Sequence, residues 1–127
     1  MLALELCAAD SSQESDSSQN ASAGMTFIFD EVDAGVGGKA AVELGRRLAK
    51  LARRNQVIVV THLPQVASWA ERQYVVSKET GKEGTHTTVR EVSGGERVRE
   101  IARMLAGSES KTSLEHAREL LHESEIE

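Results

Sequence analysis

Two short apolar runs stand out along the chain and predict the strands of its core. Residues 25–29 (Met-Thr-Phe-Ile-Phe) and residues 57–60 (Val-Ile-Val-Val) are rich in aromatic and β-branched side chains, and a continuous apolar run is typical of a buried strand. Between them, residues 39–54 repeat apolar positions at helical spacing. This order predicts a βαβ unit with parallel strands and a right-handed crossover, so the predicted fold class is α/β.

A short helix and a hairpin are predicted next. Pro64 suits the first turn of a helix that extends to about Glu71. Residues 74–78 and 85–92 have the alternation of a β-hairpin, and the Gly-Lys-Glu-Gly sequence at residues 81–84 supplies its turn. The hairpin therefore follows the parallel unit directly.

Two C-terminal helices complete the predicted elements. The first covers residues 95–106, with Ser93 as its N-cap and Gly107 as its stop. Thr112 and Glu115 fit a capping box that opens the last helix. Both helices repeat apolar residues every three or four positions.

The N-terminal part differs in character from the rest. Residues 2–9 predict the end of a helix, because Leu2 and Leu6 fall on one side. Residues 10–24 contain six serines and three acids but no Leu, Ile, Val or Phe, a composition that predicts a flexible loop. The chain therefore divides into residues 1–9, residues 10–24 and a main unit at residues 25–127.

Composition narrows the class of protein. The chain has 127 residues, a formal net charge of −5 and one cysteine, which excludes a disulfide framework and a thiolate zinc cluster. No apolar run approaches the length of a bilayer-spanning segment. A cytoplasmic protein without a membrane partner is expected, and a net acidic chain gives no global argument for nucleic-acid binding.

One segment has a net charge opposite in sign to that of the whole chain. Residues 39–54 carry six basic residues and a single acid, Glu43, for a local net charge of +5. On a helix, most of these cations project from the side opposite Ala41, Leu44 and Leu48. A solvated helix face and a DNA-contacting stripe are both compatible with this pattern. The basic residues are Lys39, Arg46, Arg47, Lys50, Arg53 and Arg54.

Polar residues that could act in catalysis or ligand binding follow both apolar runs. Asp30 and Glu31 come directly after the first run, and His62 comes two residues after the second. Carboxyl ends of parallel strands share one sheet edge, where α/β proteins bind ligands. One carboxylate there can hold Mg²⁺, and its neighbour can orient or deprotonate a water. The pattern predicts such a site at this edge.

Two motifs carry a family resemblance. Residues 27–38 (Phe-Ile-Phe-Asp-Glu-Val-Asp-Ala-Gly-Val-Gly-Gly) and residues 59–67 (Val-Val-Thr-His-Leu-Pro-Gln-Val-Ala) closely resemble the C-terminal lobe of the ATPase head in the RecN family. The likeness continues through residues 74–79 and 99–105 to the last helix. Members of this family are ABC-type ATPases related to the SMC proteins and act in bacterial DNA repair.

The resemblance implies roles for individual residues. Asp30 would help to hold Mg²⁺ as part of a Walker B element, Glu31 would be the catalytic carboxylate, and His62 would be the switch histidine near the γ-phosphate of ATP. Residues 32–38 would form the D-loop, which signals across a dimer of heads. The residues expected to bind or contact the cofactor are Asp30, Asp33, Gly35, Gly37 and Gly38.

The resemblance also implies what the complete protein does. It would be an ATP hydrolase that uses ATP and Mg²⁺, dimerises through its head domains and acts on DNA in double-strand break repair and recombination, associated with the nucleoid when bound. The 127 residues contain no Gly-x-x-x-x-Gly-Lys-Ser/Thr motif (Walker A). We therefore expect a partial P-loop fold that is inactive alone and needs the rest of its own head, and residues 1–9 would follow the missing signature motif.

Two other functions compete with this one. The chain could be a non-catalytic α/β module that docks a protein partner, in which case Asp30, Glu31 and His62 would be dispensable for binding. A receiver-type phosphoacceptor at Asp30 is disfavoured, because the sequence lacks the further acidic pair and a suitably placed lysine at neighbouring strand ends.

Overall fold

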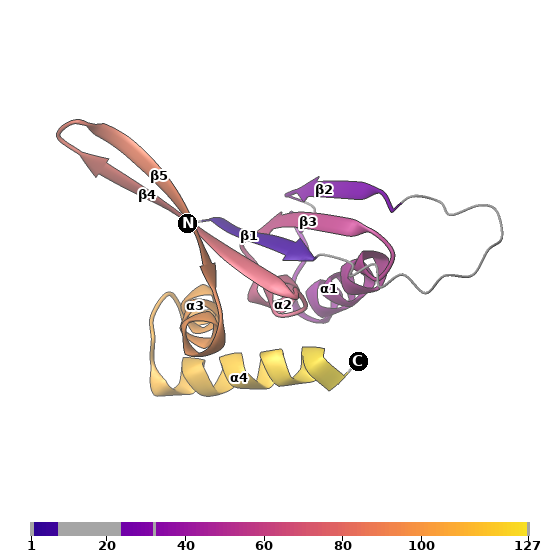
Figure 1. Cartoon of the computed structure of the whole chain (residues 1–127). Coiled ribbons are helices and arrows are strands. Elements are labelled where there is room, and N and C mark those ends of the chain that lie inside the picture. The colour runs from indigo at the N-terminus through magenta and orange to yellow at the C-terminus, as the bar shows by residue number, and fades with distance from the viewer. Residues whose placement is uncertain (1, 8–23, 32, 127) are drawn as a thin grey trace.

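The computed structural model describes residues 2–7, 24–31 and 33–126 (Figure 1). Its fold is mixed α/β, as predicted, with five strands and four helices in the described residues. In chain order these elements are β1 (Leu2–Cys7), β2 (Thr26–Asp30), α1 (Gly38–Ala52), β3 (Gln56–Thr61), α2 (Pro64–Ala67), β4 (Arg72–Gly81), β5 (Gly84–Val92), α3 (Gly94–Ala106) and α4 (Lys111–Ile126).

The strands form one sheet with the order β2-β3-β1-β4-β5. β2 pairs in parallel with β3, with Phe27 opposite Val57 and Phe29 opposite Val59. Since α1 connects these two strands, the predicted βαβ unit is confirmed. β4 and β5 form the predicted hairpin, in which Gly81 pairs with Gly84 around the turn.

The N-terminal segment is a strand, so the prediction of a helix is wrong for Leu2–Cys7. This strand lies between β3 and β4 and is antiparallel to both. Insertion there gives hydrogen-bond partners to the facing edges of β3 and β4, which tertiary pairing can favour over local helix propensity. Residues 8 and 9 of the predicted helix, and residues 10–23 of the loop predicted at residues 10–24, lie outside the described residues.

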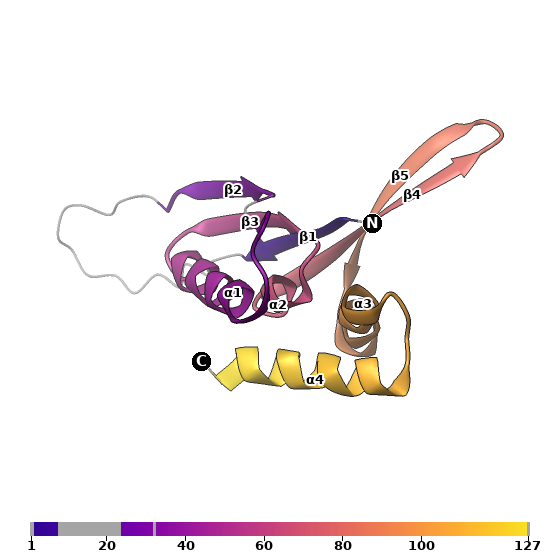
Figure 2. The ribbon, with the colours of Figure 1, turned by 180° about the vertical axis from the view of Figure 1, so that it is seen from behind.

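One face of the sheet carries the main core. Val57 and Val59 of β3 are buried against Ala41 and Leu48 of α1. Figures 1 and 2 show α1 and α2 on this side of the sheet, while no helix of the described chain covers the other side of β2 and β3. Ile28, which points away from that core, is 71% exposed.

β2 is therefore not the fully buried strand that its apolar run predicted. It is an edge strand with alternating burial, and only Phe27 and Phe29 pack against the core. Their rings are stacked, with centroids 6.2 Å apart and planes inclined by 5°. The run is apolar on both faces, but the described elements cover only one of them.

α2 is only four residues long and ends well before the predicted end at Glu71. Pro64 occupies its first turn, as expected. The Arg97 guanidinium then donates hydrogen bonds to the carbonyl oxygens of Ala67 and Ala70 at 3.3 and 2.7 Å. These oxygens have a side-chain donor from α3, which ends the helix without loss of hydrogen bonding.

α3 and α4 build a second small core. Ile101 and Ala102 of α3 pack with Ala117 and Leu120 of α4, and Ala67 joins them from α2. This cluster attaches the helical pair to α2. Figure 2 shows the pair beside α2, while the hairpin projects away from the body.

The predicted ends of these two helices are confirmed only in part. Ser93 is the N-cap of α3, but its side chain makes no cap hydrogen bond. Gly107 ends α3 in the left-handed conformation at φ 70°, as predicted. The predicted capping box of Thr112 and Glu115 is wrong. Ser110 and Ser113 form it instead: the Ser113 N–H donates to Ser110 Oγ at 3.1 Å, and the Ser110 N–H donates to Ser113 Oγ at 2.9 Å. None of the helices in the described residues combines the length and apolarity required to cross a bilayer.

Candidate functional site

The candidate site lies where the two parallel strands end. Asp30 is opposite Val60 in the β2–β3 register, so Glu31 and Thr61 leave the sheet at the same edge. His62 follows Thr61 directly. The structure therefore brings the predicted carboxylates and the predicted histidine to one edge, because both strands point the same way.

The two carboxylates at this edge are exposed and differ in backbone conformation. Asp30 lies on the uncovered face of β2, opposite to the face that carries Phe27 and Phe29. Glu31 has φ 55°, in the left-handed region that non-glycine residues rarely adopt. Its carbonyl oxygen accepts a hydrogen bond from the N–H of Ala34 at 3.1 Å. A local turn thus holds the strained residue at the point where β2 ends.

Asp33 has a different environment, because it is 2% exposed. Its Oδ2 accepts a hydrogen bond from the hydroxyl of Thr61, which is 1% exposed. Thr61 Oγ1 in turn accepts a bond from the backbone N–H of Leu63 at 3.0 Å. This chain of bonds ties the loop after β2 to the backbone after β3.

His62 lies at the outer end of that arrangement. Its Nδ1 is 4.0 Å from Asp33 Oδ2, and its side chain is 70% exposed. The imidazole is therefore close to the carboxylate and still accessible to a ligand. The buried acid thus anchors the backbone that presents an accessible histidine.

The glycines of the following loop are not closely packed by other residues. Gly35 and Gly38 have positive φ angles of 75° and 56°. A Cβ placed at Gly35, Gly37 or Gly38 would meet no atom within 4 Å. Glycine is therefore favoured at positions 35 and 38 by the backbone conformation, because a residue with an L side chain is disfavoured at positive φ. Gly37 is the N-cap of α1 and offers no side-chain cap.

The donor set at this edge limits what metal it could hold. No group of three or more His, Cys, Asp or Glu side chains that could enclose a metal occurs among the described residues. A zinc-like cage is therefore not formed within that part of the chain. Mg²⁺ needs fewer protein ligands, because it keeps several waters and commonly binds one or two carboxylates together with phosphate oxygens. Exposed Asp30 fits that requirement.

Sequence reasoning missed two features of this molecule. Thr61 was not selected, although a threonine directly before the histidine, at an inward position of β3, could have indicated it. A cavity of about 150 Å³ was also missed, on the α1 side, away from the carboxylate edge. Residues from several segments line it, and the interior of a cleft between distant segments leaves no local pattern in a sequence.

Comparison with known proteins decides the family. No protein-family model matches the chain. It is 63% identical over 97 residues to "DNA repair protein RecN" from Streptomyces coelicolor, which covers 76% of the chain and 17% of the relative. The protein of the same name from Mycobacterium leprae is 55% identical over 122 residues, or 95% of the chain and 19% of the relative. The chain matches a fragment of RecN.

More distant RecN sequences match as well. The Deinococcus radiodurans protein is 52% identical over 96 residues, again 76% of the chain and 17% of the relative. The chain thus spans less than a fifth of the length of these curated relatives. The predicted resemblance to RecN is confirmed, and it extends over most of the chain.

Proposed function

We propose that this chain is the C-terminal part of the ATPase head of a RecN-like DNA repair protein. It would supply the Walker B element, the D-loop and the switch histidine for ATP hydrolysis. The observation that carries the proposal is the parallel register of β2 and β3, which brings Asp30, Glu31 and His62 to one sheet edge. The match to RecN supports it independently.

Each residue at the edge has a distinct proposed role. Asp30 would hold Mg²⁺, which supplies charge neutralisation for the phosphates when bound. Glu31 is exposed and adjacent, so its carboxylate can accept a proton from an attacking water or orient it. His62 can donate a hydrogen bond to a phosphate oxygen, because its imidazole is largely outside the protein. These are the groups required to activate water and stabilise the developing charge.

Asp33 would act through its neighbours. Its carboxylate is buried and accepts the Thr61 hydroxyl, so direct contact with a nucleotide would require it to leave that bond. We propose that it is a positioning residue, which keeps the loop of Gly35, Gly37 and Gly38 in a fixed relation to His62. Movement of the proposed D-loop would then be transmitted to the histidine.

The chain would act with the remainder of its protein. Its 127 residues contain no Walker A motif, which in P-loop ATPases cradles the β- and γ-phosphates. The other part of the head would supply that loop, two heads would form a homodimer around ATP, and the complete protein would act on DNA. The uncovered face near Ile28 and Ile58 is where such a remainder could bury apolar surface.

The test is complementation. The 127-residue chain is mixed with a separately produced N-terminal segment of a RecN relative that carries Walker A, and phosphate release is measured. We expect hydrolysis that depends on both parts. Glu31→Gln should lower it by about 10²- to 10⁴-fold, the usual contribution of a general base. Glu83→Gln, an equivalent change at the exposed hairpin turn, is the matched control and should retain activity. Turnover retained by Glu31→Gln contradicts the proposed role of Glu31.

A docking module without catalysis is the second candidate function. The exposed Ile28 on the uncovered face favours it, because apolar side chains on such a face can bind a protein partner. It predicts that Asp30→Ala, Glu31→Ala and His62→Ala leave partner binding unchanged and that complementation yields no turnover. Association of the two segments without hydrolysis would therefore favour docking over catalysis.

A further inference from the structure

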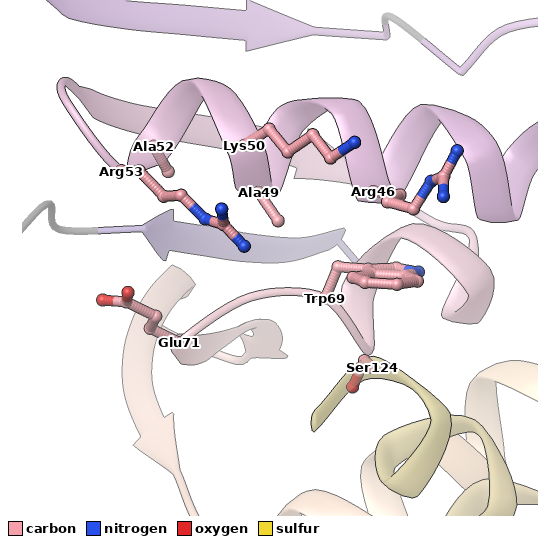
Figure 3. A pocket seen from close by; sticks show the side chains of 8 residues that line it. All are labelled: Arg46, Ala49, Lys50, Ala52, Arg53, Trp69, Glu71 and Ser124. Carbon is pink, nitrogen blue, oxygen red and sulfur yellow. The ribbon is translucent and has the colours of Figure 1, made fainter. Parts of the chain in front are cut away.

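The outer side of α1 forms one wall of a cleft. Figure 3 shows the side chains of Arg46, Lys50 and Arg53 spaced along this helix, with Trp69 and Ser124 below it. Together with residues from the turn after α2 and from the end of α4, they line a cavity of about 150 Å³. Three cationic side chains and one indole therefore share a single concave surface.

The positive charge of this wall exceeds what its own helix can balance. Glu43 is the single acidic residue within residues 39–54, which carry six basic ones. It accepts hydrogen bonds from Arg46 at 3.2 Å and Arg47 at 3.1 Å. These two guanidinium groups lower the pKa of the Glu43 carboxyl, so it stays ionised. One charge is thus shared by two cations, and Lys50 adds to the excess.

The spacing of the cations suits an extended polyanion. Arg46, Lys50 and Arg53 are separated by four and three residues, so successive cations are about 6 and 4.5 Å apart along the helix axis. A ligand with regularly spaced negative charges can contact all three, whereas a single carboxylate can contact only one or two. Guanidinium groups also bind phosphate oxygens through two parallel N–H bonds.

The far wall determines the direction of approach. Glu71 lines the cleft opposite α1, and Ser124 marks the last turn of α4, where Glu123 and Glu125 are exposed. These acids would repel a polyanion that entered from the α4 side. It would instead lie along the α1 rim, over Lys50 and Arg53, with Trp69 beside it.

We propose that the outer face of α1, with the indole of Trp69 at its side, binds the phosphate backbone of DNA. The proposal depends on the proposed function only for the choice of DNA among polyanions, since the relatives are DNA repair proteins. The binding is independent of base sequence, because phosphate contacts carry no sequence information.

The chain has a built-in reporter for this surface, because Trp69 is its only tryptophan. We would titrate the 127-residue chain with a 30-base-pair duplex and follow both the fluorescence of Trp69 and the anisotropy of labelled DNA. The expected result is saturable binding, with Kd in the range of about 10⁻⁶ to 10⁻⁴ M at physiological salt. Lys50→Ala and Arg53→Ala should each reduce the slope of log K against log salt by about 1.

The controls separate this surface from general charge effects. Lys50→Glu with Arg53→Glu should abolish binding, whereas Lys78→Glu with Lys82→Glu, the same charge change on the projecting hairpin, should reduce it only slightly. Circular dichroism checks that each variant is folded. Polyglutamate of the same charge that binds as tightly as the duplex would overturn the proposal in favour of an acidic peptide partner.

Other outcomes also contradict the proposal. Absence of binding at low salt would do so, and so would equal losses in the α1 and hairpin variants. Failure of the Glu31→Gln test leaves this result untouched, because neither Lys50 nor Arg53 lies at the carboxylate edge. The two proposals can therefore fail separately.

Discussion

The hydroxyl of Thr61 donates a hydrogen bond to the buried carboxylate of Asp33, across 28 positions of sequence. This bond links the loop after β2 to the residue that precedes His62. Neither side chain is accessible, so the link is part of the interior. Loss of this bond should alter the position of His62 and the loop after β2 without changing any exposed side chain.

Thr61→Val tests this link. Valine has the same shape but leaves the Asp33 carboxylate without its donor, and an unsatisfied buried charge costs about 1–3 kcal/mol or more. We expect the urea midpoint to fall by a corresponding amount. Thr87→Val, at an exposed position of β5, is the control and should change stability little. A Thr61→Val chain as stable as the wild type would show that the bond contributes nothing.

Gly45→Ala tests the approach of α1 to Trp69. A Cβ at Gly45 would lie 2.4 Å from Trp69 Cδ1 and 3.0 Å from the carbonyl oxygen of Gln65. Alanine would gain about 1 kcal/mol in helix propensity, but overpacking commonly costs about 1–3 kcal/mol. The carbonyl belongs to the backbone and cannot turn aside, so we expect net destabilisation in chemical denaturation.

Gly95 of α3 is the matched control for Gly45. A Cβ there meets no atom within 4 Å, and its φ is not positive. Gly95→Ala should therefore be neutral or should stabilise the chain by up to about 1 kcal/mol. Glycine-to-alanine substitution should therefore lower stability at position 45 but not at position 95. Equal changes in stability at both positions would contradict the steric argument.

Arg97 connects α3 to the end of α2. Its guanidinium donates to the Ala70 carbonyl at 2.7 Å and to Gln73 Oε1 at 3.2 Å, and Gln73 is fully buried. Hydrogen bonds from charged groups contribute about 1.5–3 kcal/mol, so Arg97→Ala should lower the free energy of unfolding by at least this amount. Arg97→Lys should restore only part of it, because an ammonium lacks the planar fork. Arg99→Ala, at an exposed position of α3, should have little effect on the same thermal melt.

The contribution of the hairpin base to folding stability should depend weakly on pH. Arg72 forms two hydrogen bonds with Glu91, at 3.0 and 2.9 Å, and lowers the pKa of that carboxyl below its ordinary value of 4.5. A carboxyl with a lowered folded pKa stabilises the fold above pH 4.5, and this contribution is lost as the pH falls through the folded pKa.

The comparison of variants isolates this contribution. Urea midpoints from pH 6 to pH 2.5 should differ between wild type and Glu91→Gln at the upper end and converge at the lower end. The effect is small because both side chains are exposed and screened by solvent. Glu83→Gln should give a curve parallel to that of the wild type throughout. A difference for Glu91→Gln that persists at pH 2.5 would assign it to packing instead of charge.

Much of this fold could be predicted because its signals are local. The apolar run at residues 57–60, the amphipathic spacing of residues 39–54 and the left-handed stop at Gly107 each depend on neighbouring residues. The parallel arrangement followed from the length of the connection. Asp30, Glu31 and His62 could be placed at one edge for the same reason.

The remaining features depend on distant partners. Leu2–Cys7 is a strand because β3 and β4 accept it between them, which no local pattern reports. α2 is short because Arg97 reaches its carbonyl groups from 30 positions away. The role of Thr61 becomes visible only when Asp33 is seen beneath the loop. Sequence patterns describe a segment, whereas these features belong to pairs of segments.

The two outer strands of the sheet give the chain unlike ends for self-association. β2 and β5 are the outermost of the described strands. Met25, just before β2, and Ile28, on its uncovered face, are 61% and 71% exposed, whereas β5 is mostly Thr and charged residues with Val89 as its main apolar exception. Exposed apolar edge strands template further strands, and charged ones resist them. Any aggregate that forms in a concentrated solution of the chain should therefore grow by addition to the β2 edge of the sheet, so its growth would be directional.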